Sequence, residues 1–140
     1  MTNAISRLSI TQAASDKLIE AASAKALEIG VNMVIVVVDE SGVLKALRRM
    51  DGAPQLSIEI ATNKAYTAAA YGFPTHGWFD FIKNDPPLLH GIVHTPRLVV
   101  FGGGYPITED GQTIGGIGIS GGHYEQDMVV AEAALAALSA

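Results

Sequence analysis

The sequence contains no cysteine, so disulfides, thiolate metal sites and a cysteine nucleophile are all excluded. It has no block of lysines or arginines, and its formal net charge is -5, which argues against nucleic acid as a partner. The longest apolar run, Met33 to Val38, is far too short to cross a bilayer, so no membrane partner is expected. The first ten residues lack the apolar core of a signal peptide, and we therefore expect a cytoplasmic protein.

The composition bounds the size and association of the protein. A chain of 140 residues can bury its own core, and we expect one domain over residues 1–140. Hydrophobic residues make up 49% of the chain and charged residues only 16%. This is an apolar composition for a small monomer, and it predicts a homo-oligomer, a dimer or larger.

Helical periodicity identifies three long helices. Ser9 and Gln12 have the spacing of a capping box and predict the start of the first helix, which Gly30 ends. The second helix has a face of small residues and ends before Gly72. The expected long helices cover residues 9–29, 55–71 and 125–138, with two short helical pieces between residues 73 and 96.

Five strands are expected from β-branched residues and turn signals. Glu40–Gly42 and Asp110–Gly111 are typical of tight turns that join neighbouring strands as hairpins. Hairpins make a sheet antiparallel, so the pattern predicts an α+β fold in which helices flank a five-stranded antiparallel sheet. The expected strands cover residues 32–39, 43–50, 97–101, 105–109 and 112–120.

Polar residues and glycines concentrate at three breaks in this pattern: RMDGAP (49–54), GGGYP (102–106) and SGGHYEQD (120–127). If the three segments lie at one end of the sheet, they border a common crevice for a small-molecule ligand. The amides of Gly122 and His123 could receive an anion at the last helix start, although an ordinary capped helix explains the same residues. The candidate ligand-binding residues are Asp51, Gly103, Gly104, Tyr105, Ser120, Gly121, Gly122 and Glu125.

His123 is the candidate catalytic residue, because the glycines before it leave room for a ligand. Its imidazole could ligate haem iron or act as a general acid or base. Arg49 or Lys64 could hold a substrate carboxylate, although Arg49 could instead pair with Asp51, and Lys64 could simply reach solvent.

The other histidines carry weaker signals. His90 and His94 are four residues apart, a spacing that can bring two metal ligands together on a helix. The glutamate of the zinc-protease motif is missing and prolines flank the pair, so we expect no metal site and keep the two as weak candidates. His76 follows Thr75 at a possible helix start, where capping is the simple explanation.

Three stretches together resemble the GlcG/HbpS-like family, which includes the C-terminal domain of the propanediol-utilisation protein PduO. They are VVVDESGVLKALRRMDGAPQLSIEIATNKAYTAA, GGGYPI and GQTIGGIGISGGHYEQD. The resemblance extends from about Leu8 to Leu138. It implies a profilin-like α/β sandwich with a five-stranded sheet, homo-oligomers, and haem or a related tetrapyrrole as a possible cofactor.

Site residues follow less directly from the resemblance. Arg49, Asp51 and Lys64 match the family's motifs, as do the glycine turn and most of the final segment. The first helix lacks the histidine that ligates haem in some members of the PduO type, and His123 stands where many relatives have threonine or serine.

Two main hypotheses follow. In the first, the protein binds haem or a related tetrapyrrole in the crevice lined by the three segments. In the second, it is a catabolic enzyme for a small metabolite, an isomerase, hydratase, lyase or hydrolase, that uses His123 as acid or base. A third, plainer possibility is an oligomeric scaffold without a site.

Overall fold

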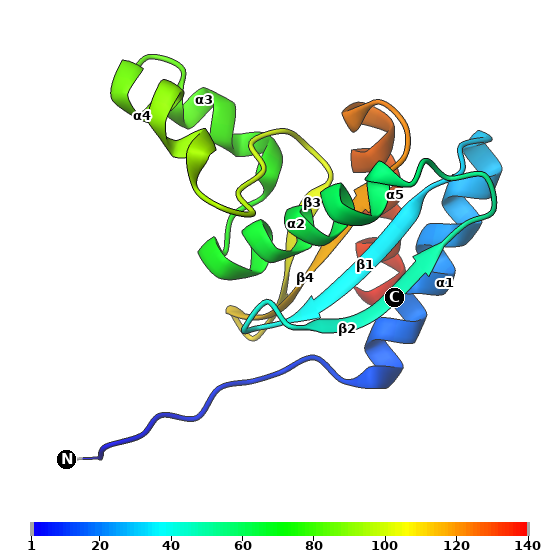
Figure 1. The fold of residues 1–140 in the computed structure, drawn as a ribbon. Coiled ribbons are helices and arrows are strands. Elements are labelled where there is room, and N and C mark those ends of the chain that lie inside the picture. Colours follow the sequence, from blue (N-terminus) through cyan, green and yellow to red (C-terminus); the bar gives the residue numbers. More distant parts are fainter. Residues whose placement is uncertain (1, 140) are drawn as a thin grey trace.

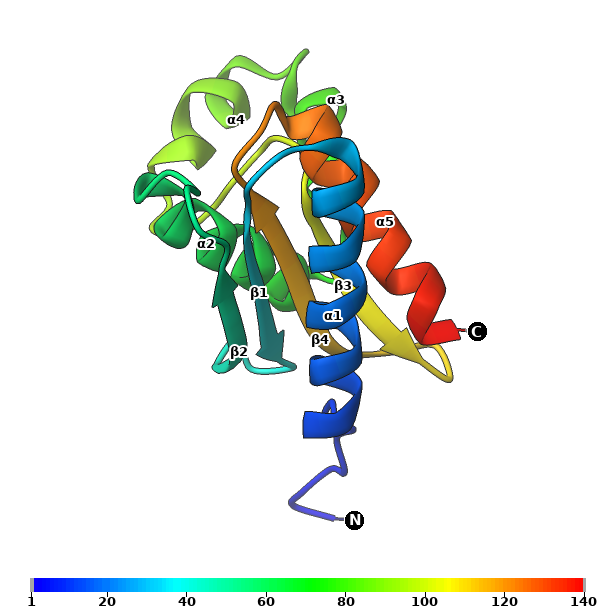
Figure 2. The same ribbon diagram turned by 90° about the vertical axis from the view of Figure 1, so that its right-hand side faces the viewer.

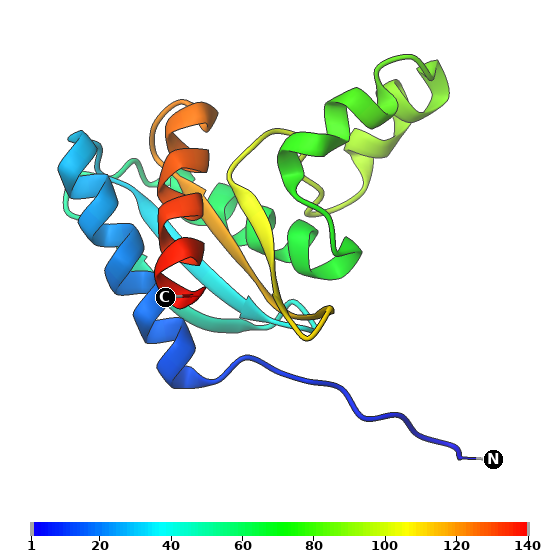
Figure 3. The ribbon, with the colours of Figure 1, turned by 180° about the vertical axis from the view of Figure 1, so that it is seen from behind.

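The computed structural model describes residues 2–139 and has three layers (Figure 1). An antiparallel sheet lies between helix α2 (Leu56–Tyr71) on one face and helices α1 (Gln12–Ile29) and α5 (Tyr124–Ser139) on the other (Figures 1 and 3). Within the described residues the sheet has four strands in the order β2-β1-β4-β3. The strands are β1 (Val34–Asp39), β2 (Leu44–Arg49), β3 (Gly104–Glu109) and β4 (Gln112–Ser120).

A lobe of short helices projects from the layered body after α2 (Figures 1 and 3). It contains a 3-10 turn at Thr75–Gly77, α3 (Trp78–Ile82), α4 (Pro86–Gly91) and a second 3-10 turn at Ile92–His94. The two short helical pieces expected from the prolines are thus confirmed. In residues 2–139 we find no helix with the length and apolar character needed to cross a membrane.

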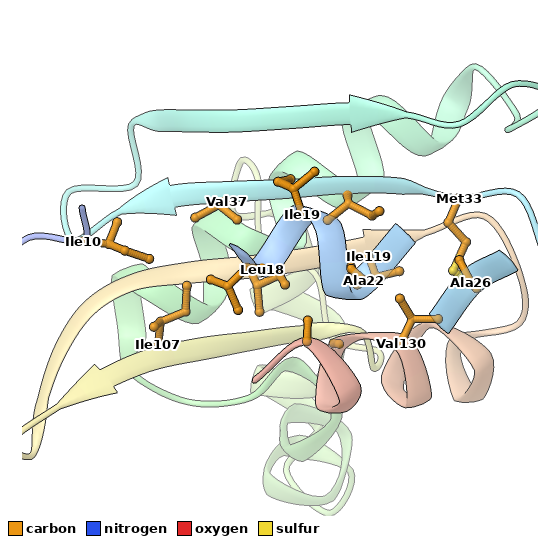
Figure 4. Close-up of a cluster of buried hydrophobic side chains, with 14 of the residues drawn as sticks. Ile10, Leu18, Ile19, Ala22, Ala26, Met33, Val37, Ile107, Ile119 and Val130 are labelled. Carbon is orange, nitrogen blue, oxygen red and sulfur yellow. The ribbon is translucent and has the colours of Figure 1, made fainter. Parts of the chain in front are cut away.

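Strand β1 is apolar throughout because both faces of the sheet are covered. Val34, Val36 and Val38 point towards α2, whereas Ile35 and Val37 point towards α1 and α5. A hydrophobic cluster lies on each face of the sheet, and the larger one fills the space between the sheet and helices α1 and α5 (Figure 4). Its members include Ile10, Leu18, Ile19, Ala22, Ala26, Met33, Ile107, Ile119 and Val130.

The small-residue face of α2 packs directly on glycines of β4. A Cβ atom at Gly118 would collide with the carbonyl oxygen of Ala61, and one at Gly116 with that of Ala65. The missing side chains therefore allow helix and strand backbones to approach more closely than other residues permit.

The turns and helix ends agree with the sequence in all but one case. Gly30 and Gly72 end α1 and α2 in the left-handed conformation, and the β3–β4 turn at Asp110–Gly111 has two positive φ angles, 52° and 77°. The capping box at Ser9 is wrong. Helix α1 begins three residues later, where Thr11 Oγ1 accepts from the Ala14 amide at 3.1 Å.

The expected fifth strand over residues 97–101 is also wrong, because this segment is bonded to a helix side chain rather than to a neighbouring strand. The Thr67 hydroxyl on α2 donates to the Arg97 carbonyl at 2.9 Å and accepts from the Val99 amide at 3.0 Å. Arg97 has a φ of 68°, which lies outside the β region. Residues 97–101 have the composition of a strand, but their hydrogen bonds to the buried Thr67 keep them out of the sheet.

Gly118→Ala is expected to lower the free energy of unfolding by about 1–3 kcal/mol, because the added methyl meets backbone that cannot move independently. Gly91→Ala is the control, since a Cβ at Gly91 has no heavy atom within 4 Å. It should change stability by less than about 0.5 kcal/mol or increase it. Urea denaturation of both variants measures the difference, and equal losses would contradict the packing argument.

Candidate functional site

The strand register brings the three glycine-rich and polar segments to one end of the sheet (Figure 2). Val34, the first residue of β1, lies opposite Arg49 of β2 on one side and Ser120 of β4 on the other. At the same end, Gly104 of β3 lies opposite Gly118. The strand order nevertheless separates RMDGAP at the β2 edge from GGGYP at the β3 edge.

A buried ion pair lies at this end of the molecule. Lys64 Nζ on α2 is 2.8 Å from Asp127 Oδ2 on α5 and also donates to the Ile119 carbonyl at 2.9 Å. The two side chains are 0% and 3% exposed. Lys64 therefore already has a carboxylate partner inside the protein, which argues against its predicted role in holding a substrate carboxylate or reaching solvent.

Burial and pairing act in opposite directions on this ion pair. Burial lowers the pKa of the Lys64 ammonium, and the charge of Asp127 opposes that shift. Burial also raises the pKa of Asp127, opposed by Lys64 and by the hydrogen bond that the Gly122 amide donates to Oδ1 at 3.2 Å. Each charge is tolerated in the interior because of the other.

The glycines of GGGYP make room for this pair. Gly103 has a φ of 123°, and a Cβ atom there would lie 2.7 Å from Lys64 Nζ. The Gly104 amide donates to Thr75 Oγ1 at 2.9 Å, and a Cβ at Gly104 would collide with the backbone of Lys64. Both glycines are buried, so the structure gives them a packing role.

The amides at the start of α5 are occupied by side chains of the same segment. The Gly122 amide donates to Asp127, the His123 amide to Gln126 Oε1 at 3.0 Å, and the Glu125 amide to His123 Nδ1 at 3.2 Å. This is the self-capped helix start that the sequence left open as the alternative to an anion site.

His123 is exposed and acts as part of this cap. Because Nδ1 accepts from an amide, the proton of the neutral imidazole resides on Nε2, which then has no lone pair for a metal. Ligation of iron through Nε2 would require breaking the cap bond. The geometry thus weighs against His123 as an iron ligand, while its assignment as a site residue stays a prediction.

The residues predicted to act with His123 do not converge on it. Arg49 and Asp51 are both exposed, and no ion pair joins them within the described residues. Lys64 is buried and contacts the ends of β3 and β4 through Gly104 and Ile119, whereas Arg49 ends β2 at the other edge of the sheet. An acid or base with a carboxylate anchor, as the enzyme hypothesis requires, is not assembled in this arrangement.

The remaining predicted residues have structural surroundings. Ser120 is buried at the end of β4, and Gly121 has a φ of 152° and a close approach to Asn32. The Tyr105 hydroxyl donates to Glu132 Oε2 at 2.7 Å on α5. Glu125 is exposed.

His90 and His94 lie on different elements, the first on α4 and the second in the following 3-10 turn, and both are exposed. Across residues 2–139 no cluster of three or more potential metal ligands occurs. The pair therefore lacks the third protein ligand that a zinc site needs.

A groove with a volume of about 420 Å³ opens at the β3 side of this end. Phe79, Phe101 and Tyr124 are the aromatic residues in its wall, with exposures of 54%, 43% and 44%. The Phe101 ring covers the buried Lys64, whose Nζ is 5.0 Å from the ring centroid. The full lining is His76, Phe79, Asp80, Val100, Phe101, Gly102 and Tyr124.

His76 is the histidine in this groove, and the sequence did not identify it as a site residue. No hydrogen bond among the described residues engages either of its ring nitrogens, and its ring centroid is 5.4 Å from that of Tyr105. Capping is the wrong explanation for this segment, because the Thr75 hydroxyl bonds Gly104 and no side chain caps the turn. The aromatic residues that follow in WFDF were the signal that could have identified it.

Comparisons with known proteins agree with this architecture. The family model described as "Haem degrading protein HbpS-like" matches residues 10–136. An uncharacterized 15.0 kDa protein of the dhaT-dhaS intergenic region of Citrobacter freundii is 44% identical over 128 residues, which is 90% of this chain and 89% of that protein.

Two solved structures are similar over nearly their whole length. Protein ORFY of Klebsiella pneumoniae is 37% identical with a TM-score of 0.94, covering 100% of this chain and 97% of that one. The PduOC chain, solved as a complex with haem, is 38% identical with a TM-score of 0.86, covering 93% of this chain and 95% of that one.

Asp127→Ala is expected to lower the free energy of unfolding by about 3–5 kcal/mol, because it leaves the Lys64 ammonium buried without its oppositely charged partner. The double variant Lys64→Met/Asp127→Ala should lose less than the sum of the two single variants. Urea denaturation of Lys64→Met, of Asp127→Ala and of the double variant measures the interaction energy between the two side chains. The exposed pair Lys25–Glu28 is the control, and Glu28→Ala should cost less than about 1 kcal/mol. Additive losses at residues 64 and 127 would contradict the pairing.

Tyr105 predicts a pH dependence at the alkaline end. Burial, and then the hydrogen bond to Glu132, raise the pKa of the Tyr105 phenol above its usual value of about 10. The folded state holds this proton more tightly than the unfolded state, so the contribution is present below pH 10 and is lost as the pH rises above it. Unfolding free energies measured from about pH 8 to about pH 11, a range that spans the usual tyrosine pKa, should fall less steeply for Tyr105→Phe than for the wild type. Parallel profiles would rule this contribution out.

Proposed function

Because the chain belongs to the HbpS-like family of haem-degrading proteins, we propose that it binds haem or a related tetrapyrrole at the sheet end described above. The single observation that supports this location is the groove, which combines three exposed aromatic rings with an imidazole that makes no hydrogen bond within residues 2–139. The haem complex of PduOC, at 38% identity, supports the choice of ligand.

The groove residues fit a tetrapyrrole in chemical terms. Phe79, Phe101 and Tyr124 offer flat apolar surface for a macrocycle, and His76 offers a ring nitrogen to the iron. Bound haem would supply redox and oxygen chemistry at its iron. The role of the chain itself is to hold and orient the group and to cover one of its faces.

Haem titration of the apo-protein, followed by visible absorbance, tests this function. We expect saturable binding with a Soret band. His76→Ala should weaken binding by about tenfold or more, since loss of a ligand costs at least as much as loss of an outer-shell partner. His123→Ala should leave the spectrum unchanged.

A matched pair on α3 tests the groove separately from the iron ligand. Phe79 and Phe81 are similarly exposed, at 54% and 57%, but only Phe79 is part of the groove wall. Phe79→Ala should weaken haem binding and Phe81→Ala should not. Loss of the Soret band in His123→Ala alone would move the site to the α5 start, and no saturable binding by the wild type would overturn the proposed function.

A further inference from the structure

Helix α2 leaves one strand of the sheet uncovered. A helix is about 10–12 Å across and neighbouring strands are about 4.8 Å apart, so a single helix cannot cover all four strands. Among residues 2–139, α2 packs against β4, β1 and β3 but barely touches β2, whereas the other face of the sheet is covered by two helices. The α2 side of β2 is therefore bare in a single copy of the chain.

The side chains on this bare side of β2 are apolar. Leu44 and Leu47 lie opposite Val38 and Val36 of β1, and residues directly opposite one another in an antiparallel pair share a face of the sheet. Because those valines point towards α2, the two leucines lie on the α2 side as well. Leu44 is 56% exposed and Leu47 is 41% exposed.

Two further apolar side chains extend this surface, Val43 between β1 and β2 and Leu56 at the start of α2. They are 59% and 65% exposed. Ala53 and Ile58, on either side of Leu56 in the sequence, pack against the cluster of β1 valines, which places the start of α2 beside the same valines. We call the surface formed by Val43, Leu44, Leu47 and Leu56 the β2 strip.

Two opposite charges flank the β2 strip. Arg49 lies opposite Val34 and so shares the α2 side of β2, and Glu59 is in the first turn of α2. Both side chains are exposed, and no ion pair within residues 2–139 includes either of them. An apolar surface with one acid and one base at its rim is complementary to a second copy of itself, because a two-fold axis presents each charge to its opposite.

We propose that the β2 strip is the contact surface between two copies of this chain. The leucines of one copy lie on those of the other, and Arg49 of each copy pairs with Glu59 of its neighbour. The copies meet through this face rather than through the edge of β2, because pairing β2 with itself would bring Lys45 and Arg48 of the two copies together. The inference does not depend on haem binding.

Sedimentation velocity of the full chain tests the contact by measuring the mass of the assembly. We expect an even number of copies in the wild type. Leu47→Glu places an unpaired carboxylate in the contact and should leave at most half that number at the same protein concentration. Leu27→Glu is the matched control, because Leu27 is an exposed leucine of α1 outside the strip, and it should sediment as the wild type does. Circular dichroism of both variants checks that they are folded.

Three outcomes would overturn the proposal. A monomeric wild type would mean that the strip serves a different partner or none. An unchanged mass in Leu47→Glu would place the contact elsewhere on the molecule. An equal loss of mass in Leu27→Glu would show that the effect is not specific to the strip.

A charge exchange tests the two-fold arrangement. Arg49→Glu and Glu59→Arg should each raise the dissociation constant of the assembly about tenfold or more, because each substitution places like charges opposite one another. The double variant Arg49→Glu/Glu59→Arg should recover most of this loss, since the pair forms again with its charges exchanged. If the double variant associates no better than the single variants, the two residues do not meet across the contact and the proposed arrangement is wrong.

Discussion

Lys64 and Asp127 come from helices on opposite faces of the sheet, yet their charged groups meet at 2.8 Å. The sheet separates helix α2 from helices α1 and α5. Side chains from the two helix layers can therefore meet only beyond the end of the sheet. The Gly103 turn provides that passage, because any side chain there would occupy the position of the Lys64 ammonium. The carbonyl of Ile119 completes the contact and ties both helices to the last residues of β4.

This contact explains why polar residues and glycines concentrate in the segment SGGHYEQD (120–127). Asp127 can receive Lys64 only if the first turn of α5 is fixed, and the segment fixes that turn with its own side chains. Asp127 itself accepts from the Gly122 amide, so the same carboxylate caps the helix and neutralises the lysine. The contacts that build the sheet end therefore explain the polar cluster, and the groove lined by Phe101 and Tyr124 lies beside it.

The sequence predicted the three long helices and both hairpins, because periodicity and turn chemistry are local. It left open whether the three segments share one end of the sheet. It failed where one side chain far along the chain decides the outcome. Thr67 binds residues 30 and 32 positions later and prevents a fifth strand, and Lys64 meets a partner 63 positions away. His76 was overlooked for the same reason, since its groove is completed by residues of α5 and of the segment before β3.

Helix α3 has only five residues, and two neighbouring positions of it serve different cavities. Trp78 is a wall of a pocket of about 270 Å³ between α2 and residues 92–98, and Phe79 is a wall of the groove at the sheet end. A ligand that displaces this short helix from either side alters the opposite wall as well. Ligands bound in the two cavities would therefore be thermodynamically linked through this helix, and the factor by which one changes the affinity for the other would be the same in both directions.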